Sequence, residues 1–476
     1  MAISLDQNIL NILKEKYKDG VESLLKADSS ALREVKVVRV TGEATNMAAV
    51  SDCGGAVSAN ALVAKDKAAA MPPTAEFRVT PGELYSVFTF GYREVQASDK
   101  GGAYERITGI KSFCAATAMR KVLGKAFYGR GYGELAVMGT ANAALLAAAS
   151  AGDEIVLELP ISAVMGIARD MDLVIKTSVS DSTEQVILTV TKINGKKVTV
   201  QVGTGAYASA AATDVLCYRG SMDENGGPGL PVGLAGWLPI VGARVESTTS
   251  TPSDWDTYIS TPFYGRNRSV NVDGEAGGFF YDTNNTTYKA DIQGAMMWSR
   301  IMGGKCDFIT MHPVALQILD NETSSANTYF TATTTRARKS ATVGFDKFSA
   351  SFSTNYIDMI YDDAFINEKE FYVLTKDLVE LWAYTNAERA KEDAIAGNNP
   401  GKQDPMEFND KGHENDSYKL LIDDILTVES GDYTRHAASV RCTYNLCGTF
   451  AVINPSVMVH GLFHDAVPAD IVSCVA

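Results

Sequence analysis

One stretch constrains the fold of this chain more than any other: residues 103–129 form its longest helical pattern. Apolar and small side chains recur at steps of three and four and would form one helix face, namely Ile107, Ile110, Cys114, Thr117, Ala118, Val122 and Ala126. Basic side chains would lie on the rest of the surface: Arg106, Lys111, Arg120, Lys121 and Lys125. Glycines at 129, 131 and 133 end the pattern. At 1.5 Å per residue the helix would be roughly 40 Å long, which predicts a stiff strut or, more simply, an ordinary core helix.

Length and charge limit the function. The chain has 476 residues, which at about 150 residues per domain allows about three domains. Hydrophobic residues make up 46% of the chain, enough for a sizeable core. The net charge of −14 argues against a protein that grips a nucleic-acid backbone, because such proteins need a basic face. It suits a soluble protein, or the wall of a container that should not adhere to an enclosed polyanion.

The cysteines and the N-terminus exclude further classes. The seven cysteines are scattered and no C-x-x-C occurs, so the sequence indicates neither a disulfide framework nor a zinc site. We expect reduced thiols. The N-terminal segment lacks the basic stretch and apolar core of a signal peptide. No run of about 18 apolar residues occurs, so we expect no membrane span.

The segment before the strut contains little that could form a core of its own. Residues 4–26 have an amphipathic helical pattern, either an arm that docks on a neighbouring subunit or a helix packed on its own domain, with the stripe Leu10, Leu13, Tyr17, Val21 and Leu24. Residues 27–100 show only short strand patterns, at 35–40, 77–79 and 85–92. Such a long loop is unusual in a compact monomer. It would persist if it lies on another subunit, and the alternative is disorder.

Strand patterns dominate the region after the strut. We expect a short strand at 134–138 and a small antiparallel subdomain inserted at 153–220, with strands at 154–159, 173–179, 186–192, 197–202 and 215–218. Asn194-Gly195 lies between two alternating runs and is a strong hairpin signal. A linker rich in glycine and proline follows, and it carries an apolar anchor at Leu234 and Trp237.

The last part of the chain combines a compact α/β unit with further strands. We expect a helix at 289–302, a strand at 308–311 and a second helix from Pro313 to Leu319. Further strands are expected at 356–361, 371–375, 420–429, 438–444 and 448–453. Asp362-Asp363 should form a turn between the first two of these strands. Residues 323–340 and 387–412 read as exposed loops.

Motifs that carry enzyme chemistry were sought, and none was found. The sequence has no G-x-x-x-x-G-K-[ST], no G-x-S-x-G and no H-E-x-x-H. His460 and His464 alone have metal-ligand spacing, but they lie in a coil-like tail. Asp362-Asp363 and Asp423-Asp424 could be carboxylate pairs, and we interpret both as solvated turns. We therefore predict no catalytic, cofactor-binding or metal-binding residue and no enzyme.

Four phrases, in order, carry a family resemblance. Residues 231–234 (P-V-G-L) and 264–269 (Y-G-R-N-R-S) are similar to "G-L … Y-G-G-I-x-R-S", although Arg266-Asn267 replaces the usual Gly-Ile. Residues 306–313 resemble "x-D-x-I-x-x-N-P", and 360–374 resemble a "V-x-D … Y-x-L" hairpin. Residues 445–455 resemble a closing strand that ends in Asn-Pro. With the order of elements, these phrases resemble the tailed-bacteriophage major capsid proteins of the Hong Kong 97-type fold from about residue 75 to 460.

The resemblance implies an α+β fold and an assignment for each segment. Helix 103–129 would be the spine helix of a peripheral domain, and the tip of the axial domain would line the centre of each hexamer or pentamer. The basic loop at 333–339 is the candidate tip. The segments would be an arm (1–44), an extended loop with entry strands (45–102), the spine helix and start of the peripheral domain (103–152), a β-rich insertion (153–220), a linker (221–274), an axial domain (275–345) and returning strands with the C-terminus (346–476).

The resemblance also implies a function. The chain would assemble with itself into hexamers and pentamers of an icosahedral head that encloses double-stranded DNA without sequence-specific contact, in the virion and assembled in the host cytoplasm. Partners would be a separate scaffolding protein, a portal and a decoration protein; we expect no membrane contact, no cofactor and no maturation cut. Candidate inter-subunit contacts are Leu10, Leu13, Tyr17, Tyr85, Phe88, Phe90, Arg106, Lys111, Arg120, Arg266, Arg268, Arg336 and Arg338.

Three alternatives remain open. The first is a nanocompartment shell of the same fold that stores cargo, as encapsulins do. The second is a multidomain hydrolase with a nonstandard site, which a monomeric protein with a deep pocket and perturbed carboxylates would favour. The third is another virion component, such as a tail or decoration protein.

Overall fold

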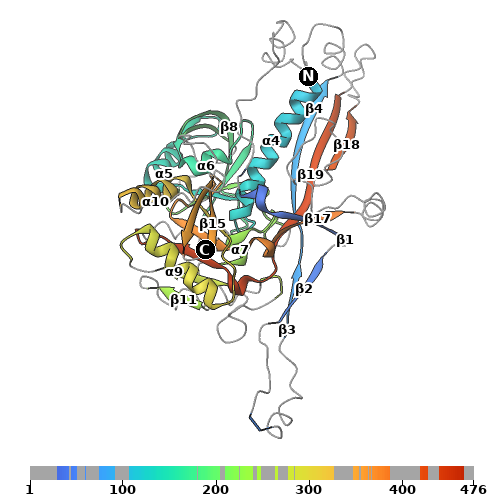
Figure 1. Ribbon diagram of the computed structural model, residues 1–476. Coiled ribbons are helices and arrows are strands. Elements are labelled where there is room, and N and C mark those ends of the chain that lie inside the picture. Colours follow the sequence, from blue (N-terminus) through green and yellow to red (C-terminus); the bar gives the residue numbers. More distant parts are fainter. Residues whose placement is uncertain are drawn as a thin grey trace, which may run out of the picture.

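The computed structural model describes residues 29, 31–41, 44–50, 59–60, 74–91, 107–178, 181–203, 210–223, 226–239, 244–247, 263–265, 277–282, 285–325, 347–352, 355–362, 364–365, 367–385, 419–426 and 439–465. These residues form three large sheets, one long helix and a separate two-stranded sheet. Figure 1 shows a body made of the six- and seven-stranded sheets with their helices, beside which the long helix and the longest strands stand.

The long helix is α4, Ile107–Tyr128, which confirms the helix predicted there. Its 22 residues correspond to about 33 Å. It lies along β4 (Gly82–Gly91) and β19 (Ser439–Val452) (Figure 1). We call α4 the spine helix.

The expected amphipathic pattern of the spine helix is wrong for its second half. Arg120 and Lys125, expected on the surface, are only 9% and 2% exposed. The Lys125 Nζ donates a 2.9 Å hydrogen bond to the Phe365 carbonyl oxygen. The physical reason is that from Met119 to Tyr128 the helix is packed on nearly every side, and the long aliphatic stems of both cations lie within the core.

A five-stranded sheet runs beside the spine helix. It contains β1 (Lys36–Thr41), β17 (Val379–Thr385), β19, β18 (Lys419–Leu426) and β4. The two strands expected at 438–444 and 448–453 are one 14-residue strand, β19. Gly448 lies inside this strand, and a side chain there would be crowded, because a Cβ would lie 2.8 Å from the Trp382 carbonyl oxygen.

A six-stranded sheet forms the second layer, in the order β5-β10-β7-β8-β9-β6. Its strands are β5 (Glu134–Val137), β10 (Val215–Tyr218), β7 (Asp172–Lys176), β8 (Val186–Asn194), β9 (Lys197–Val202) and β6 (Glu154–Glu158). All five strands expected after residue 153 are present, with the hairpin at Asn194-Gly195. However, β5 pairs with β10, so the unit does not begin at 153. Two helices accompany it, α5 (Gly139–Ala148) and α6 (Ile161–Met165).

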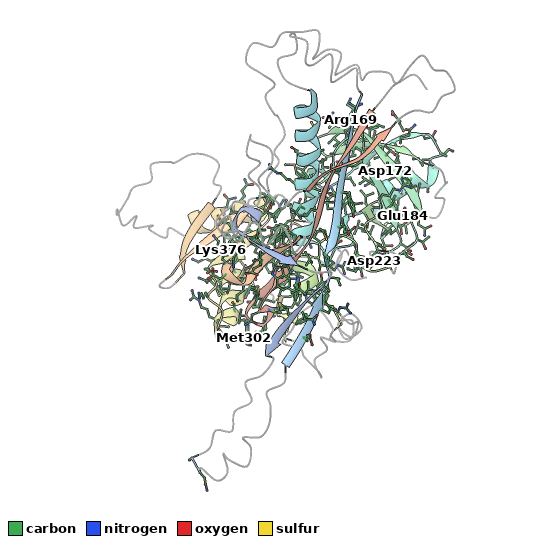
Figure 2. The ribbon with its side chains drawn as sticks, turned by 90° about the vertical axis from the view of Figure 1, so that its right-hand side faces the viewer. Arg169, Asp172, Glu184, Asp223, Met302 and Lys376 are labelled. Carbon is green, nitrogen blue, oxygen red and sulfur yellow. The ribbon has the colours of Figure 1, made fainter. Side chains whose placement is uncertain are left out.

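A surface ion-pair cluster lies on this six-stranded unit. The Arg219 guanidinium is 2.9 Å from Asp172 Oδ2 and 3.9 Å from Glu184 Oε2. Figure 2 shows Asp172 and Glu184, with Arg169, on the part of the unit that faces away from the two-stranded sheet. All three side chains of the cluster are about one-third to one-half exposed, so the pairs contribute little to stability.

A seven-stranded sheet forms the third layer, in the order β11-β12-β20-β16-β13-β15-β14. Its strands are β11 (Arg244–Ser247), β12 (Phe279–Asp282), β20 (Val459–Leu462), β16 (Glu370–Leu374), β13 (Phe308–Met311), β15 (Asn355–Tyr361) and β14 (Lys347–Phe352). The helices α9 (Tyr288–Ile301) and α10 (Pro313–Ser325) belong to it and confirm the predicted α/β unit. Short 3-10 turns lie at Leu32–Glu34, Lys376–Leu378 and Pro455–Val457.

Two predictions for this sheet are wrong. The strands β15 and β16 are not a hairpin, because β13 lies between them, parallel to β15 and antiparallel to β16. His460 is not in a coil-like tail; it belongs to β20 and is fully buried. Because β20, β16, β15 and β14 all lie outside residues 275–345, that range is not a self-contained unit.

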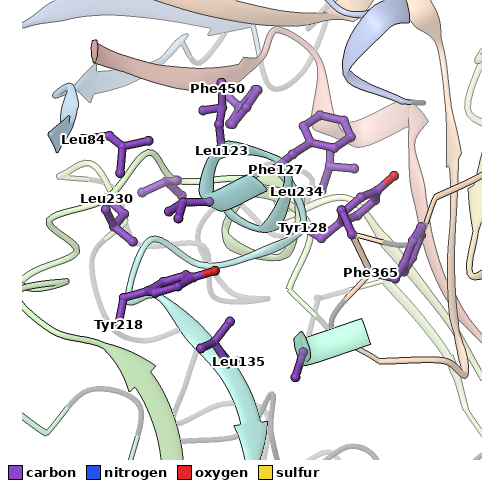
Figure 3. Close-up of a cluster of buried hydrophobic side chains, with 14 of the residues drawn as sticks. Leu84, Leu123, Phe127, Tyr128, Leu135, Tyr218, Leu230, Leu234, Phe365 and Phe450 are labelled. Atoms are coloured by element: carbon purple, nitrogen blue, oxygen red, sulfur yellow. The ribbon is translucent and has the colours of Figure 1, made fainter. Parts of the chain in front are cut away.

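The main core lies where the spine helix ends. The ring centroids of Phe127 and Phe450 are 5.0 Å apart, and those of Tyr128 and Phe365 are 4.0 Å apart. Figure 3 shows these side chains around the last turn of the helix, with Leu234 from the linker among them. The core therefore joins the spine helix, β19 and the linker.

A two-stranded sheet projects from the body (Figure 1). It consists of β2 (Thr45–Val50) and β3 (Thr74–Val79), paired antiparallel. The sequence assigned residues 45–102 to an extended loop with entry strands, and within that range β4 pairs along β19 in the five-stranded sheet. We call β2 and β3 the hairpin.

Candidate functional site

The hairpin is rooted in the main core. Phe77 of β3 is fully buried, and its ring centroid lies 5.5 Å from that of Trp237 and 6.5 Å from that of Phe263. The Arg78 backbone N–H donates a 3.0 Å hydrogen bond to the Tyr264 carbonyl oxygen. Beyond this base, β2 and β3 pair only with each other within the described residues. An isolated two-stranded hairpin is marginally stable in water, so the outer part needs a further surface to lie on.

The predicted apolar anchor in the linker is confirmed. Leu234 and Trp237 belong to a short helix, α7 (Leu234–Trp237), and both are fully buried. The Trp237 Nε1–H donates a 2.7 Å hydrogen bond to the Phe450 carbonyl oxygen. Gly233 fits directly under the spine helix, because a Cβ there would lie 2.1 Å from the Ala126 carbonyl oxygen. The linker is thus clamped between the spine helix and β19.

A buried carboxylate holds the point where the N-terminal segment joins the body. Asp362, expected in a solvated turn, is 1% exposed. Its Oδ2 accepts hydrogen bonds from the Ser29 hydroxyl, from the Ala31 N–H at 3.2 Å and from the Tyr128 hydroxyl at 3.2 Å. Its Oδ1 accepts one from the Ala364 N–H at 3.0 Å. No local sequence signal distinguishes this aspartate from its neighbour, because its partners are distant in sequence.

Burial and the Asp362 carboxylate both raise the pKa of Tyr128. Its pKa is raised well above the ordinary value, first because burial disfavours the phenolate and then because the Asp362 charge lies close to it. The Tyr128 hydroxyl also lies 2.7 Å from Thr310 Oγ1. The end of the spine helix, the N-terminal segment and β13 therefore meet at one neutral hydroxyl and one carboxylate.

The exposed side chains on the two helices of the seven-stranded unit are uncharged among the described residues. The exposed side chains of α9 are Gln293, Met297 and Ile301, which share one stripe at steps of four. Met297 is 52% and Ile301 61% exposed, which is unusual for large apolar side chains. The described exposed side chains of the adjacent α10 are Val314, Gln317 and Asn321. These exposed side chains carry no charge, on a chain with a net charge of −14.

A second apolar surface lies on the six-stranded unit. The outward side chains of α5 include Ala141, Ala144, Leu145 and Ala148, and none of its ten residues is charged. Nearby in sequence, Val156, Ile161 and Met165 are also largely exposed. The adjacent edge strand β6 is partly blocked, because the Asn142 side-chain amide bonds both the N–H and the carbonyl oxygen of Glu158. This blocking disfavours addition of another strand there.

The paired histidines of the sequence do not share a site. His460 Nδ1 lies 2.8 Å from the Leu238 carbonyl oxygen, whereas His464 Nδ1 lies 2.9 Å from Asp291 Oδ2. Burial is the main cause of the raised pKa of Asp291. Among the described residues, no group of three His, Cys, Asp or Glu side chains is placed to hold a metal ion. Within the same residues, no helix is long and apolar enough to cross a membrane.

The structure places only some of the candidate contact residues. Tyr85 is 53% exposed on β4, and Phe88 and Phe90 lie opposite Cys442 and Val440 of β19. Lys111 and Arg120 belong to the spine helix, where Arg120 is buried. The remaining candidates lie outside the described residues: Leu10, Leu13, Tyr17, Arg106, Arg266, Arg268, Arg336 and Arg338. The sequence analysis did not identify the exposed surfaces of α5, α9 and α10, although the lack of charge in 137–152 was a readable signal.

Tyr85 should lose its phenolic proton at a higher pH than an ordinary tyrosine does. The hydrogen bond from its hydroxyl to Glu83, followed by partial burial and the Glu83 charge, raises its pKa to about 12. Since the folded pKa lies above the ordinary 10, the associated stability is fully present below pH 10 and is lost as the pH rises from 10 to 12. NMR titration of ring-labelled tyrosine should show this. Glu83→Gln should return the Tyr85 midpoint toward 10, and an unchanged midpoint would contradict the assignment.

Comparison with known proteins gives structural neighbours alone. No protein-family model and no curated protein sequence matches the chain. The cyanophage A-1(L) capsid protein is similar over 93% of this chain and 94% of its own, at 11% identity and a TM-score of 0.47. The holo-SrpI encapsulin of Synechococcus elongatus is similar over 96% and 95%, at 8% identity and 0.39. The capsid protein of a native GTA particle is similar over 94% of both chains, at 10% and 0.36.

Proposed function

We propose that this chain is the major capsid protein of a tailed bacteriophage, of the Hong Kong 97-type fold, and acts as a structural protein rather than an enzyme. The observation that carries the proposal is the hairpin. Its base is fixed in the core by Phe77, but β2 and β3 pair with no other strand among the described residues. A subunit built this way gains its remaining contacts from a neighbour. The motif phrases of the sequence support the same family.

The proposal assigns a task to each exposed feature. The hairpin lies over the adjacent subunit. The uncharged stripes of α9 and α10 face neighbours around the axis of each hexamer or pentamer, and the spine helix with the five-stranded sheet sets the span of the subunit. Acidic side chains elsewhere keep the chain soluble, and they limit its adhesion to the enclosed double-stranded DNA. The N-terminal segment, held at Asp362, extends as the arm.

The proposal also covers the partners of the chain and the place where it assembles. A scaffolding protein guides assembly in the host cytoplasm, a portal occupies one vertex, and a decoration protein binds outside. The apolar surface of α5 and α6 is the candidate surface for that last partner or for a neighbouring subunit. The contact residues proposed from the sequence remain proposals, except that burial of Arg120 makes it a support of the subunit rather than an outer contact.

Electron microscopy of the full chain tests the proposal. The protein should be expressed alone and then with its genomic neighbours, and imaged by negative staining. Closed icosahedral particles or rings of five and six subunits are expected. Large DNA-filled particles would identify a phage head, whereas small particles with protein cargo would identify an encapsulin-like compartment. A monomer under both conditions would overturn the shell function.

The double variant Met297→Lys, Ile301→Lys should block assembly without unfolding the subunit. Both side chains are more than half exposed in the subunit, so the substitution costs it little. In an interface, two buried ammonium groups cost several kcal/mol, which lowers particle yield more than about tenfold. Size-exclusion chromatography gives the yield, and circular dichroism checks the fold.

The matched control is Gln201→Lys on the exposed face of β9. It adds one ammonium group, where the double variant adds two, to a surface with no proposed contact, so particles should form as in the wild type. Normal particles from the double variant would show that the α9 stripe faces solvent in the assembly.

A further inference from the structure

A small cavity lies at the end of the spine helix and belongs to none of the surfaces described above. It is lined by Lys125, Glu134, Tyr218 and Leu230 and by the glycines at 129, 131 and 133. Figure 3 shows Tyr218 and Leu230 beside the chain where it leaves the helix for β5. The cavity therefore sits at the joint between the spine helix, the six-stranded sheet and the linker.

Glu134 brings an incompletely paired carboxyl group to this cavity. Its side chain is 4% exposed. Its Oε1 accepts a 2.8 Å hydrogen bond from the Arg130 backbone N–H and lies 3.7 Å from the Arg130 Nε. Its Oε2 is buried without a hydrogen-bond partner among the described residues. Leaving a buried charged oxygen unpaired costs about 1–3 kcal/mol or more, so a partner at this atom would be strongly favoured.

The size of the cavity restricts that partner. Its volume is about 10 Å³, which is close to the minimum that a single water molecule needs. An organic ligand or a hydrated ion does not fit. A bare cation is disfavoured, because the cationic Lys125 lines the same space and Arg130 is already beside Glu134.

The other polar walls suit a water molecule. The Tyr218 hydroxyl donates its hydrogen to the Gly166 carbonyl oxygen at 2.7 Å, which leaves its lone pairs as acceptors. A water molecule can donate one hydrogen to Glu134 and the other to the Tyr218 hydroxyl, so the cavity offers the two polar partners that a buried water requires.

We propose that one structural water molecule occupies this cavity and donates a hydrogen bond to Glu134 Oε2. The water lies between β5, the last turn of the spine helix and β10. It is an integral part of the joint that fixes the six-stranded sheet to the helix. The proposal stands on the subunit alone and does not depend on what the protein assembles into.

A density map of the full chain, as particle or as subunit, at a resolution that shows ordered water tests the proposal. The wild type should show one isolated peak about 2.6–3.2 Å from Glu134 Oε2. Glu134→Gln keeps a polar atom at the site and should keep the peak. Glu134→Leu removes that atom, and the peak should be lost.

Three results would overturn the proposal. One is an empty cavity in the wild-type map, and another is a peak with the short contacts and high coordination of a metal ion. The third is a Glu134 side chain turned to a protein partner. If Glu134→Leu does not fold, the wild-type and Glu134→Gln maps still decide the question.

Discussion

Gly233→Ala is expected to destabilise the subunit by more than about 3 kcal/mol, among the largest effects of any single methyl group in this chain. The added Cβ would lie 2.1 Å from the Ala126 carbonyl oxygen and 2.2 Å from that of Phe127. These are backbone atoms in the last turn of the spine helix, so they cannot move aside as a flexible side chain would. The Gly233 N–H also donates a 3.0 Å hydrogen bond to the Gly129 carbonyl oxygen, which the displaced linker would lose.

Thermal unfolding of the unassembled subunit measures this effect, because particle contacts would mask it. The matched control is Gly277→Ala, where the nearest atom to the added Cβ is 3.8 Å away on Pro239. The free energy of unfolding of that variant should lie within about 1 kcal/mol of the wild-type value. Equal melting temperatures for Gly233→Ala and Gly277→Ala would show that the linker does not lie tightly under the helix.

Asp362→Ala should lower the free energy of unfolding of the subunit by about 3–5 kcal/mol, the range found when one partner of a buried charged network is removed. The carboxylate accepts hydrogen bonds from Ser29, Ala31, Tyr128 and Ala364, and the substitution leaves these donors buried without it. The N-terminal segment should also separate from the body. Limited proteolysis should therefore cut the variant near residue 29 at least about tenfold faster than the wild type. A loss of more than about 1.4 kcal/mol of local stability raises the population of the open, cleavable form by that factor.

Two further variants make the Asp362 experiment specific. Asp377→Ala removes an aspartate whose side chain is 76% exposed and lies 3.6 Å from Lys305 Nζ, and it should change stability by less than about 1 kcal/mol. Asp362→Asn keeps one acceptor oxygen and should lie between the wild type and Asp362→Ala. If Asp362→Ala is cleaved at the wild-type rate, the N-terminal segment is held by other contacts.

Local elements could be predicted from the sequence because their signals are local. Alternation of apolar side chains identified β8 and β9, and Asn194-Gly195 identified the turn between them. Spacing of three and four residues identified α4, and Pro313 marked the start of α10. The predicted bounds of β8 and β9 were close to those observed, whereas α10 continues to Ser325, beyond the predicted end at Leu319 and into the stretch 323–340 that was expected to be a loop.

Pairing between distant segments could not be predicted in the same way. Nothing in the residues of β15 and β16 shows that β13 enters between them, because strand order depends on contacts across the whole chain. The same holds for Asp362, whose partner Ser29 is 333 positions away. Lys125 shows a related limit, since a charged residue on the polar side of a helix is expected in water unless a core covers that side too.

The position of β20 also limits when the subunit can be completed during its synthesis. This strand, Val459–Leu462, is an inner strand of the seven-stranded sheet, between β12 and β16. A growing polypeptide emerges from the ribosome with its N-terminus first. The sheet that supports α9 and α10 therefore lacks an inner strand until residues 459–462 have been synthesised. In a shorter nascent chain β12 and β16 have no strand between them, so the surface of these two helices is not yet supported.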